Sequence, residues 1–399
     1  MKTANYSLKY ICQKPYLLPF GQAAADLKKG IELNETGVFL WNCLRETDNE
    51  HKLLSMMCDK YMPENKTEIN TLKSDLTRFL NELKAFHIFE REEDVMTLPP
   101  NYVTKHISIA GINICFHTEP VIFPEEFKAF ETNETQNPDI TINITHFIPA
   151  YHRAGKVILR SDELILMEDD YFYICAYTGS AQPMEWHMSK DGSRCVIYYK
   201  KNNQSHESQR IDAKKESSGF KPESGGFIFH AVRMIFLFTA QKRGLFALHS
   251  ASVLYGGKAW LFSGHSGAGK STHTRLWQDT FNTPVINGDL NLIGTDKNEL
   301  YAAGIPWCGT SGIFTENTYP VGGIIMIKQS SRDSVSKLSG EKAALKIMQR
   351  MISPCWTDKM LDLNISASQL ITRKIPVFEL NCTKNPAAAY IMKEAIDRL

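Results

Sequence analysis

The sequence predicts a mixed α/β (α+β) protein with three segments, at residues 1–95, 100–224 and 225–399. The first segment carries capped amphipathic helices. The second carries strands with alternating apolar residues, and the third alternates strands with helices around a glycine-rich loop. Strands that alternate with helices are typical of α/β domains, and 399 residues allow about two or three domains.

Composition and charge exclude some functional classes. The net charge of +1 gives no global basic field for nucleic acid or an anionic membrane. The 9 cysteines show no CxxC pair or zinc spacing, which favours reduced thiols and a cytoplasmic location. Residues 1–20 do not resemble a signal peptide, and the apolar stretch 227–240 contains His230 and Arg233. We therefore expect a buried helix there and no membrane span.

The first segment, 1–95, predicts a winged-helix-like module. Asn34 is expected to cap a helix at 33–44, and TDNE at 47–50 fits a capping box that opens a second helix. A strand at 86–92 would follow the third helix and contribute to a hairpin. The third helix is predicted by one apolar stripe, namely Ile69, Leu72, Leu76, Phe79, Leu80 and Leu83.

A winged helix raises the question of DNA binding, which needs a basic face. The third helix does not offer one, and we expect no nucleic-acid partner. Its charges are balanced, with Lys73, Arg78 and Lys84 against Glu68, Asp75 and Glu82.

Residues 16–44, YLLPFGQAAADLKKGIELNETGVFLWNCL, resemble the PqqD-like family of peptide-recognition modules, notably in LNETGVFLW. The resemblance implies that residues 1–95 bind a peptide, which would add to an open edge strand through backbone hydrogen bonds. The alternative is a small helical domain that only packs against its neighbour.

The second segment, 100–224, is β-rich. Residues 107–116 alternate and break at Ala110-Gly111, as in a hairpin, and 139–144 place three isoleucines on one face. The acids at 168–170 fit a solvated turn, and the polar stretch 201–224 fits a loop or disordered connection. Further strands are predicted at 156–160, 163–167, 171–177 and 194–199.

The third segment, 225–399, opens with a helix at 227–243 that Gly244 would cap. Strands and helices follow in alternation. Strands are predicted at 245–255, 258–264, 284–294, 321–329 and 375–382, and helices at 339–352 and 385–399.

The stretch GHSGAGKST, 264–272, matches the pattern of a phosphate-binding loop between a strand and a helix. Its glycines let successive amides point at one anion, and the helix N-terminus adds partial positive charge. Lys270 would reach the β- and γ-phosphates, and the Ser271 hydroxyl would bind Mg²⁺. The predicted nucleotide-binding residues are Gly264, His265, Ser266, Gly267, Ala268, Gly269, Lys270, Ser271 and Thr272.

Two further residues are candidates for the same site. Asp289 closes the next predicted strand, so its carboxylate could bind the metal or act as a base, or it could simply cap the turn in NGD. His249 lies one strand before the loop, either near the γ-phosphate or as a buried structural histidine.

The order of these features, LHSASVLYGGKAWLFSGHSGAGKST followed by VINGD, resembles the HPr kinase/phosphorylase-like family and its branch of lasso-peptide and related serine kinases. The resemblance covers about residues 245–330. It implies that the loop binds ATP with Mg²⁺, that Asp289 deprotonates a serine hydroxyl, and that His249 is the matching catalytic histidine. Those kinases form rings, so the resemblance also allows a homo-oligomer.

One position departs from that family, which has two adjacent acids where this chain has Gly288-Asp289. A single acid puts phosphorylase activity in doubt, and Glu316 is a candidate for a second one. The segment GIPWCGTSG, 304–312, could be a functional loop or a glycine-rich turn with a packed tryptophan.

These features predict an ATP- and Mg²⁺-dependent kinase, with the catalytic residues Asp289, His249 and Lys270 and the metal ligands Ser271 and Asp289. The sequence contains no NKxD guanine-binding motif, so we expect ATP as the nucleotide in place of GTP. The acceptor would be a Ser or Thr hydroxyl of a peptide or protein that residues 1–95 help to bind. The alternatives are a small-molecule hydroxyl kinase and a non-catalytic nucleotide-sensing protein that binds peptides.

Overall fold

The structure is a computed structural model, and its chain divides into two compact units, Met1–Thr97 with Pro149–Lys156, and Leu98–Ile148 with Val157–Leu399. The second unit contains most of the two predicted segments 100–224 and 225–399. The structure describes residues 6–20, 24, 30–47, 49–85, 102–134, 137–146, 156–169, 172–177, 184–199, 224–383 and 385–399.

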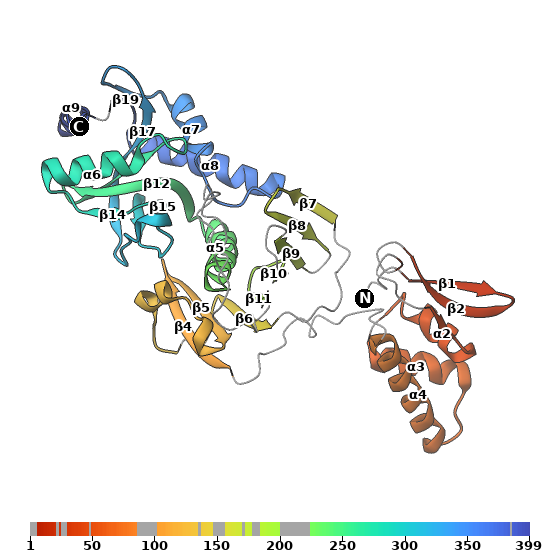
Figure 1. Ribbon diagram of the computed structural model, residues 1–399. Coiled ribbons are helices and arrows are strands. Elements are labelled where there is room, and N and C mark those ends of the chain that lie inside the picture. Colours follow the sequence, from red (N-terminus) through yellow and green to blue (C-terminus); the bar gives the residue numbers. More distant parts are fainter. Residues whose placement is uncertain are drawn as a thin grey trace, which may run out of the picture. The chain divides into compact units, whose positions relative to one another are not determined.

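The first unit combines a small antiparallel sheet with helices (Figure 1). The sheet order is β1-β2-β3, so β1 is an outer strand. The core packs Leu17 of the sheet against Leu40, Trp41, Leu53 and Met57 of the helices. The elements are β1 (Tyr6–Ile11), β2 (Lys14–Pro19), β3 (Ile31–Glu32), α2 (Glu35–Cys43), α3 (Glu50–Tyr61) and α4 (Lys66–Ala85).

The helix starts agree with the sequence in one case and correct it in another. Asn34 caps α2, because its side chain accepts a hydrogen bond from the Gly37 amide. The prediction of a capping box at 47–50 was wrong, because the N-cap of α3 is Asn49 and not Thr47. The Asn49 side chain accepts a hydrogen bond from the Lys52 amide. The predicted strand at 86–92 lies outside the described residues.

The second unit begins with an eight-stranded sheet in the order β4-β5-β6-β11-β10-β9-β8-β7. The predicted hairpin is confirmed, with Ala110 and Gly111 at φ 51° and 76° in its turn. The strands are β4 (Val103–Ile109), β5 (Ile112–Thr118), β6 (Ile140–His146), β7 (Lys156–Arg160), β8 (Leu164–Glu168), β9 (Phe172–Tyr177), β10 (Met184–Ser189) and β11 (Arg194–Tyr199). Short 3-10 helices lie at Pro120–Ile122 and Glu125–Phe130.

Helix α5 (Ser224–Lys242) ends beside Gly244, whose φ of 75° suits a helix end, as predicted. The helix contacts β10 and β11 of this sheet and β12 of the next, and Figure 1 shows it between the two. One hydrophobic core joins Trp186, Tyr199, Phe236 and Trp307 across these layers. The predicted loop at 201–224 lies outside the described residues up to residue 223.

The last sheet surrounds a second core. Its strand order is β13-β12-β15-β16-β17-β19-β18, and β14 pairs with β12 off this path. Because β13 also pairs in parallel with β17, the five strands from β13 to β17 in this order form a closed ring. Helix α6 contacts β12, β13 and α9 on the outside. The strands are β12 (Phe246–Tyr255), β13 (Lys258–Ser263), β14 (Val285–Asn287), β15 (Leu290–Asp296), β16 (Glu299–Ala303), β17 (Tyr319–Gln329), β18 (Ser334–Lys337) and β19 (Val377–Cys382).

The remaining helices pack around this sheet, and a short 3-10 turn lies at Gly309–Ser311. The structure therefore confirms a mixed α/β (α+β) fold with several sheets and helices. Among the described residues, none of the helices is long and apolar enough to cross a membrane. The helices are α6 (Lys270–Phe281), α7 (Gly340–Met348), α8 (Asp358–Lys374) and α9 (Ala387–Asp397).

Candidate functional site

The predicted phosphate loop lies between β13 and α6, as the sequence indicates. Gly267 and Gly269 have φ angles of 73° and 106°, a left-handed conformation that glycine adopts without strain. Gly264 sits where a Cβ would be 2.9 Å from the carbonyl oxygen of Ile327. The side chain of Gln329 donates to the Gly267 carbonyl at 2.8 Å. The loop is thus held against β17, and each glycine meets a steric or conformational need.

Lys270 is the first residue of α6 and is largely buried. Burial lowers the pKa of its ammonium group; the negative charge of Asp289 opposes this shift, and Arg350 adds to it. His265, Ser266 and Ser271 are exposed, so the mouth of the loop is open. The first amides of α6 lack partners within the helix, so they and Lys270 together form a site suited to an anion.

Asp289 lies in a turn between two strands, which corrects the expectation that it ends a single strand at 284–294. Asn287 organises this turn, because its side-chain oxygen accepts hydrogen bonds from the amides of Asp289 and Leu290 at 3.0 and 3.1 Å. The Asp289 carboxylate is therefore not needed to cap the turn. The Asp289 carbonyl accepts from the Ser250 amide at 2.9 Å, which fixes the residue against β12.

His249, on β12, lies beside this carboxylate. Its Nε2 is 3.5 Å from Oδ1 of Asp289, and its side chain is half-buried. Burial, followed by the charge of Lys270, lowers the pKa of His249, and Asp289 opposes the change. The imidazole is therefore neutral at pH 7 and can exchange a proton with Asp289 or with a ligand.

Two arginines that sequence reasoning did not assign to the site act on it electrostatically. The charge of Arg350 lowers the pKa of His249 and of Lys270, and that of Arg233 lowers the pKa of His249. The charge of Asp289 in turn raises the pKa of Arg233. Arg350 follows α7, and its carbonyl accepts from the His249 amide at 2.9 Å. With Lys270, these side chains are three cations whose charges act on His249, which favours an anionic ligand nearby.

The segment 304–312 contains the packed tryptophan that one of the two sequence expectations named. Trp307 is buried against Phe236, with ring centroids 5.0 Å apart, and so belongs to the core. Two residues later, Gly309 (φ 62°) packs directly on Asp289, since a Cβ there would lie 2.9 Å from the Asp289 Cγ. The loop therefore fixes the position of Asp289.

Glu316 does not join this site. It packs near the backbone of Gly304 and lines a separate hollow of about 700 Å³ that also contains Asp296 and Glu299. Among the described residues, no group of three His, Cys, Asp or Glu side chains could hold a metal ion. A Mg²⁺ ion at Ser271 and Asp289 would thus need phosphate and water oxygens, which is common for this ion.

The side chain of Ser311 occupies the space that a side chain at residue 288 would need. A Cβ at residue 288 would lie 1.9 Å from the Ser311 Oγ and 2.4 Å from its Cβ. The Ser311 hydroxyl is itself fixed, because it donates to the Cys308 carbonyl at 2.7 Å and accepts from the Ile313 amide at 3.1 Å. A second acid next to Asp289 therefore does not fit this loop.

A Gly288→Ala variant is expected to unfold more easily, by about 1–3 kcal/mol, because the added methyl group overpacks the site. Urea unfolding measures the loss. The double variant Gly288→Ala/Ser311→Gly should recover most of it, since it removes the atoms in conflict. Equal stability of Gly288→Ala and the parent chain would show that the loop moves aside freely.

His230, on α5, makes the stability depend on pH. Burial lowers its pKa to about 4 from 6.5, and the charge of Arg233 adds to this shift. As the pH falls below 6.5, the unfolded chain therefore binds the proton first, and stability decreases down to about pH 4. Between pH 7 and 5 we expect a loss of about 2 kcal/mol from this group.

Urea unfolding at pH 7 and pH 5 checks this effect. A His230→Gln variant should lose about 2 kcal/mol less than the parent over that interval, because its side chain does not titrate. The same pH dependence in both proteins would contradict the assignment.

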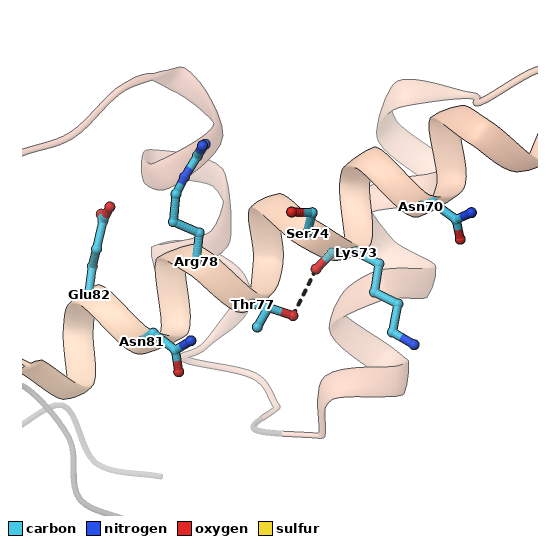
Figure 2. A pocket seen from close by; sticks show the side chains of 7 residues that line it. All are labelled: Asn70, Lys73, Ser74, Thr77, Arg78, Asn81 and Glu82. Atoms are coloured by element: carbon cyan, nitrogen blue, oxygen red, sulfur yellow. Dashed lines mark hydrogen bonds between the residues drawn. The ribbon is translucent and has the colours of Figure 1, made fainter.

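A further polar hollow, of about 730 Å³, lies on α4 in the first unit (Figure 2). Arg78 pairs with Asp75 at 2.7 Å, and Glu82 lies on the same helix, so this surface is not uniformly basic. The absence of a nucleic-acid partner stays a prediction. The lining residues are Asn70, Lys73, Ser74, Thr77, Arg78, Asn81 and Glu82.

Comparisons with known proteins place this site in context. A family model described as SynChlorMet cassette protein ScmC matches residues 227–393, less than half of the chain but including the phosphate loop, His249 and Asp289. Among solved structures, the Hpr(Ser) kinase/phosphatase from Coxiella burnetii is similar at 11% identity, over 38% of this chain and 97% of that chain, with a TM-score of 0.24. No curated protein matches.

These findings bear unequally on the two resemblances. The structural match is to an HPr kinase, but its TM-score of 0.24 is too low to carry any argument, so the resemblance of residues 245–330 to that family stays a prediction. The family match begins at residue 227, so it does not reach residues 1–95. The PqqD-like character of that segment stays a prediction.

Proposed function

We propose that this protein is an ATP- and Mg²⁺-dependent kinase that phosphorylates a Ser or Thr hydroxyl of a peptide or protein. The proposal rests chiefly on the convergence of Lys270, Asp289 and His249 at the mouth of a phosphate-binding loop. The residues present fit the triphosphate, since Gly267 and Gly269 have the left-handed backbone that turns amides toward an anion and Lys270 is desolvated beside them.

Each residue has a part in the transfer. The loop amides and Lys270 neutralise the phosphate charge, and Ser271 and Asp289 would hold Mg²⁺, which would neutralise further negative charge. Asp289 takes the proton from the acceptor hydroxyl, and neutral His249, 3.5 Å away, can share it. The acceptor oxygen then bonds to the γ-phosphorus, the bond from that phosphorus to the β-phosphate oxygen breaks, and ADP leaves.

The first unit would bind the peptide. Strand β1 is an outer strand of its sheet, and Tyr10 and Ile11 on it are 63% and 50% exposed. An outer strand has unpaired backbone groups along one side, to which an extended peptide can add. This supports delivery of a peptide acceptor by residues 1–95, in keeping with their resemblance to PqqD-like modules.

A transfer assay tests this function. The intact chain, γ-labelled ATP and Mg²⁺ are incubated with Ser- and Thr-containing peptides, and phosphopeptides are detected by mass spectrometry. We expect the peptides to be phosphorylated, and we expect this phosphorylation to decrease when a second peptide competes for binding to the first unit. Phosphorylation of small hydroxyl compounds alone would favour a small-molecule kinase, and nucleotide binding without any transfer would favour a nucleotide-sensing protein.

A further inference from the structure

Asp289 and Ser250 face each other where β14 and β15 are interrupted opposite β12. The pairs on either side of this break have the same register, which places the two residues opposite each other. Residues that face each other in this way in an antiparallel ladder exchange two bonds, from each amide to the other carbonyl. Among the described backbone contacts, this pair makes one of the two, from the Ser250 amide to the Asp289 carbonyl at 2.9 Å. The flanking pairs are His249–Leu290 and Ser252–Asn287.

The two backbone groups that the ladder leaves free are bonded to asparagine side chains instead. The Asp289 amide donates to Oδ1 of Asn287 at 3.0 Å, and the Ser250 carbonyl accepts from Nδ2 of Asn291 at 2.6 Å. These asparagines lie two residues before and two residues after Asp289, and both are 3% exposed. Because buried backbone groups need partners, the two side chains together allow the ladder to stay open at Asp289.

Asn291 is itself held by two buried serines of β12. Its Nδ2 also donates to the Ser250 hydroxyl oxygen at 3.0 Å, and its Oδ1 accepts from the Ser252 hydroxyl at 2.7 Å. The Ser250 hydroxyl donates onward to the Leu248 carbonyl at 3.1 Å. The three side chains are 0–3% exposed, so the amide of Asn291 is fixed by a buried network in which each member has a partner.

His249 has supports of its own on the other side of β12. Its amide donates to the Arg350 carbonyl at 2.9 Å, and its carbonyl accepts from the Ser263 hydroxyl at 2.7 Å. The distance of 3.5 Å from its Nε2 to Oδ1 of Asp289 therefore depends on where the opened ladder places Asp289.

We propose that Asn291 is a positioning residue, which keeps the ladder open at Asp289 and thereby places the Asp289 carboxylate beside His249. Without the Asn291 amide, the Ser250 carbonyl would take the Asp289 amide, and β14 and β15 would close into one strand. This inference rests on the proposed kinase function, in which Asp289 is the base, and adds a residue that acts through it.

An Asn291→Leu variant of the full-length chain tests the proposal, because leucine has a similar size but cannot donate to the Ser250 carbonyl. We expect the transfer rate at saturating ATP to fall about 10²-fold, since a displacement of about 1 Å at a reacting group has an effect of this size. ATP affinity from calorimetric titration should stay within about twofold, because Asn291 lies outside the phosphate loop. A merely structural network would leave the transfer rate of the folded variant unchanged.

Two further variants complete the comparison. Asn143→Leu is the matched control, because Asn143 is an equally buried strand asparagine, on β6, whose Oδ1 lies 2.8 Å from Nδ1 of His117. It should leave transfer and ATP affinity unchanged. The triple variant Ser250→Ala/Ser252→Ala/Asn291→Leu also removes the two hydroxyls that the single variant leaves unpaired, so it should fold and show the same loss. Near-ultraviolet circular dichroism reports whether each variant is folded.

Crystal structures of the parent and the triple variant give a readout that needs no kinase activity. In the variant, the Asp289 amide should donate to the Ser250 carbonyl, and Oδ1 of Asp289 should lie at least about 1 Å farther from Nε2 of His249. An unchanged position of Asp289, or an unchanged transfer rate in a folded variant, would overturn the inference. Displacement of the carboxylate as expected, with no transfer by the parent to any acceptor, would instead count against the proposed function.

Discussion

A Lys270→Ala variant is expected to lose about 10²–10³-fold in the rate of phosphoryl transfer and to bind ATP more weakly. Lys270 is a largely buried cation at the start of α6. The charge of Asp289 raises the pKa of Lys270, and the charge of Lys270 lowers the pKa of His249, so the three groups interact. Without it, the charge that develops on the transferred group is left to the loop amides. Single-turnover transfer and calorimetric titration with ATP measure the two effects.

Lys258→Ala is the matched control, because Lys258 is an exposed lysine at the opposite end of β13. It should leave both quantities unchanged. If Lys270→Ala bound ATP as tightly as the parent and kept its transfer rate, the assignment of the loop would be wrong.

An Asp289→Asn variant is expected to bind ATP but to transfer phosphate about 10²–10⁴-fold more slowly, because an amide cannot accept the acceptor proton. The asparagine side chain has the same shape as the aspartate it replaces. The fold should tolerate the change, since Asn287 and not the Asp289 carboxylate organises the turn. Rapid-quench transfer at saturating ATP separates the chemical step from binding.

Asp296→Asn provides the control for this variant. Asp296 is exposed at the other end of β15 and lines a different hollow, so transfer should be unaffected. Transfer by Asp289→Asn at a rate within about tenfold of the parent would contradict a role for Asp289 as the base.

The phosphate loop could be predicted from sequence because its geometry is local. Nine consecutive residues, 264–272, contain the glycines, the lysine and the serine, and the neighbouring strand and helix are contiguous with them. His249 and Asp289 were also identified, although only the pairing of β12 with β14 and β15 brings them to 3.5 Å. Arg233 and Arg350 could not be predicted, since a helix interior and a loop after α7 reach the site through tertiary packing alone.

Some elements gave no readable pattern. The turn of the first hairpin is formed by Cys12 and Gln13 at φ 49° and 66°, where a glycine or asparagine signal is normally expected. Strand β10 is buried on both faces, so MEWHMS shows no alternation between apolar and polar residues. Helix α8 buries the polar residues Asn364 and Ser368, which interrupt the apolar periodicity by which a buried helix face is recognised in a sequence.

The strand predicted at 284–294 divides into β14 and β15 for a local and a long-range reason. The Asn287 side chain accepts hydrogen bonds from the amides of Asp289 and Leu290, which forms the turn locally. Gly288 has no room for a side chain beside Ser311, and Gly309 packs on Asp289, so residues 308–311 also restrain the turn, and this second contact cannot be inferred from the local sequence.

Calorimetric titration of the full-length chain with AMP, ADP and ATP, each with Mg²⁺, tests most directly whether this loop holds a triphosphate. Affinity should rise with each added phosphate, because the amides, Lys270 and Ser271 contact that end of the nucleotide. Equal affinity for the three nucleotides, or no binding of any, would contradict the account.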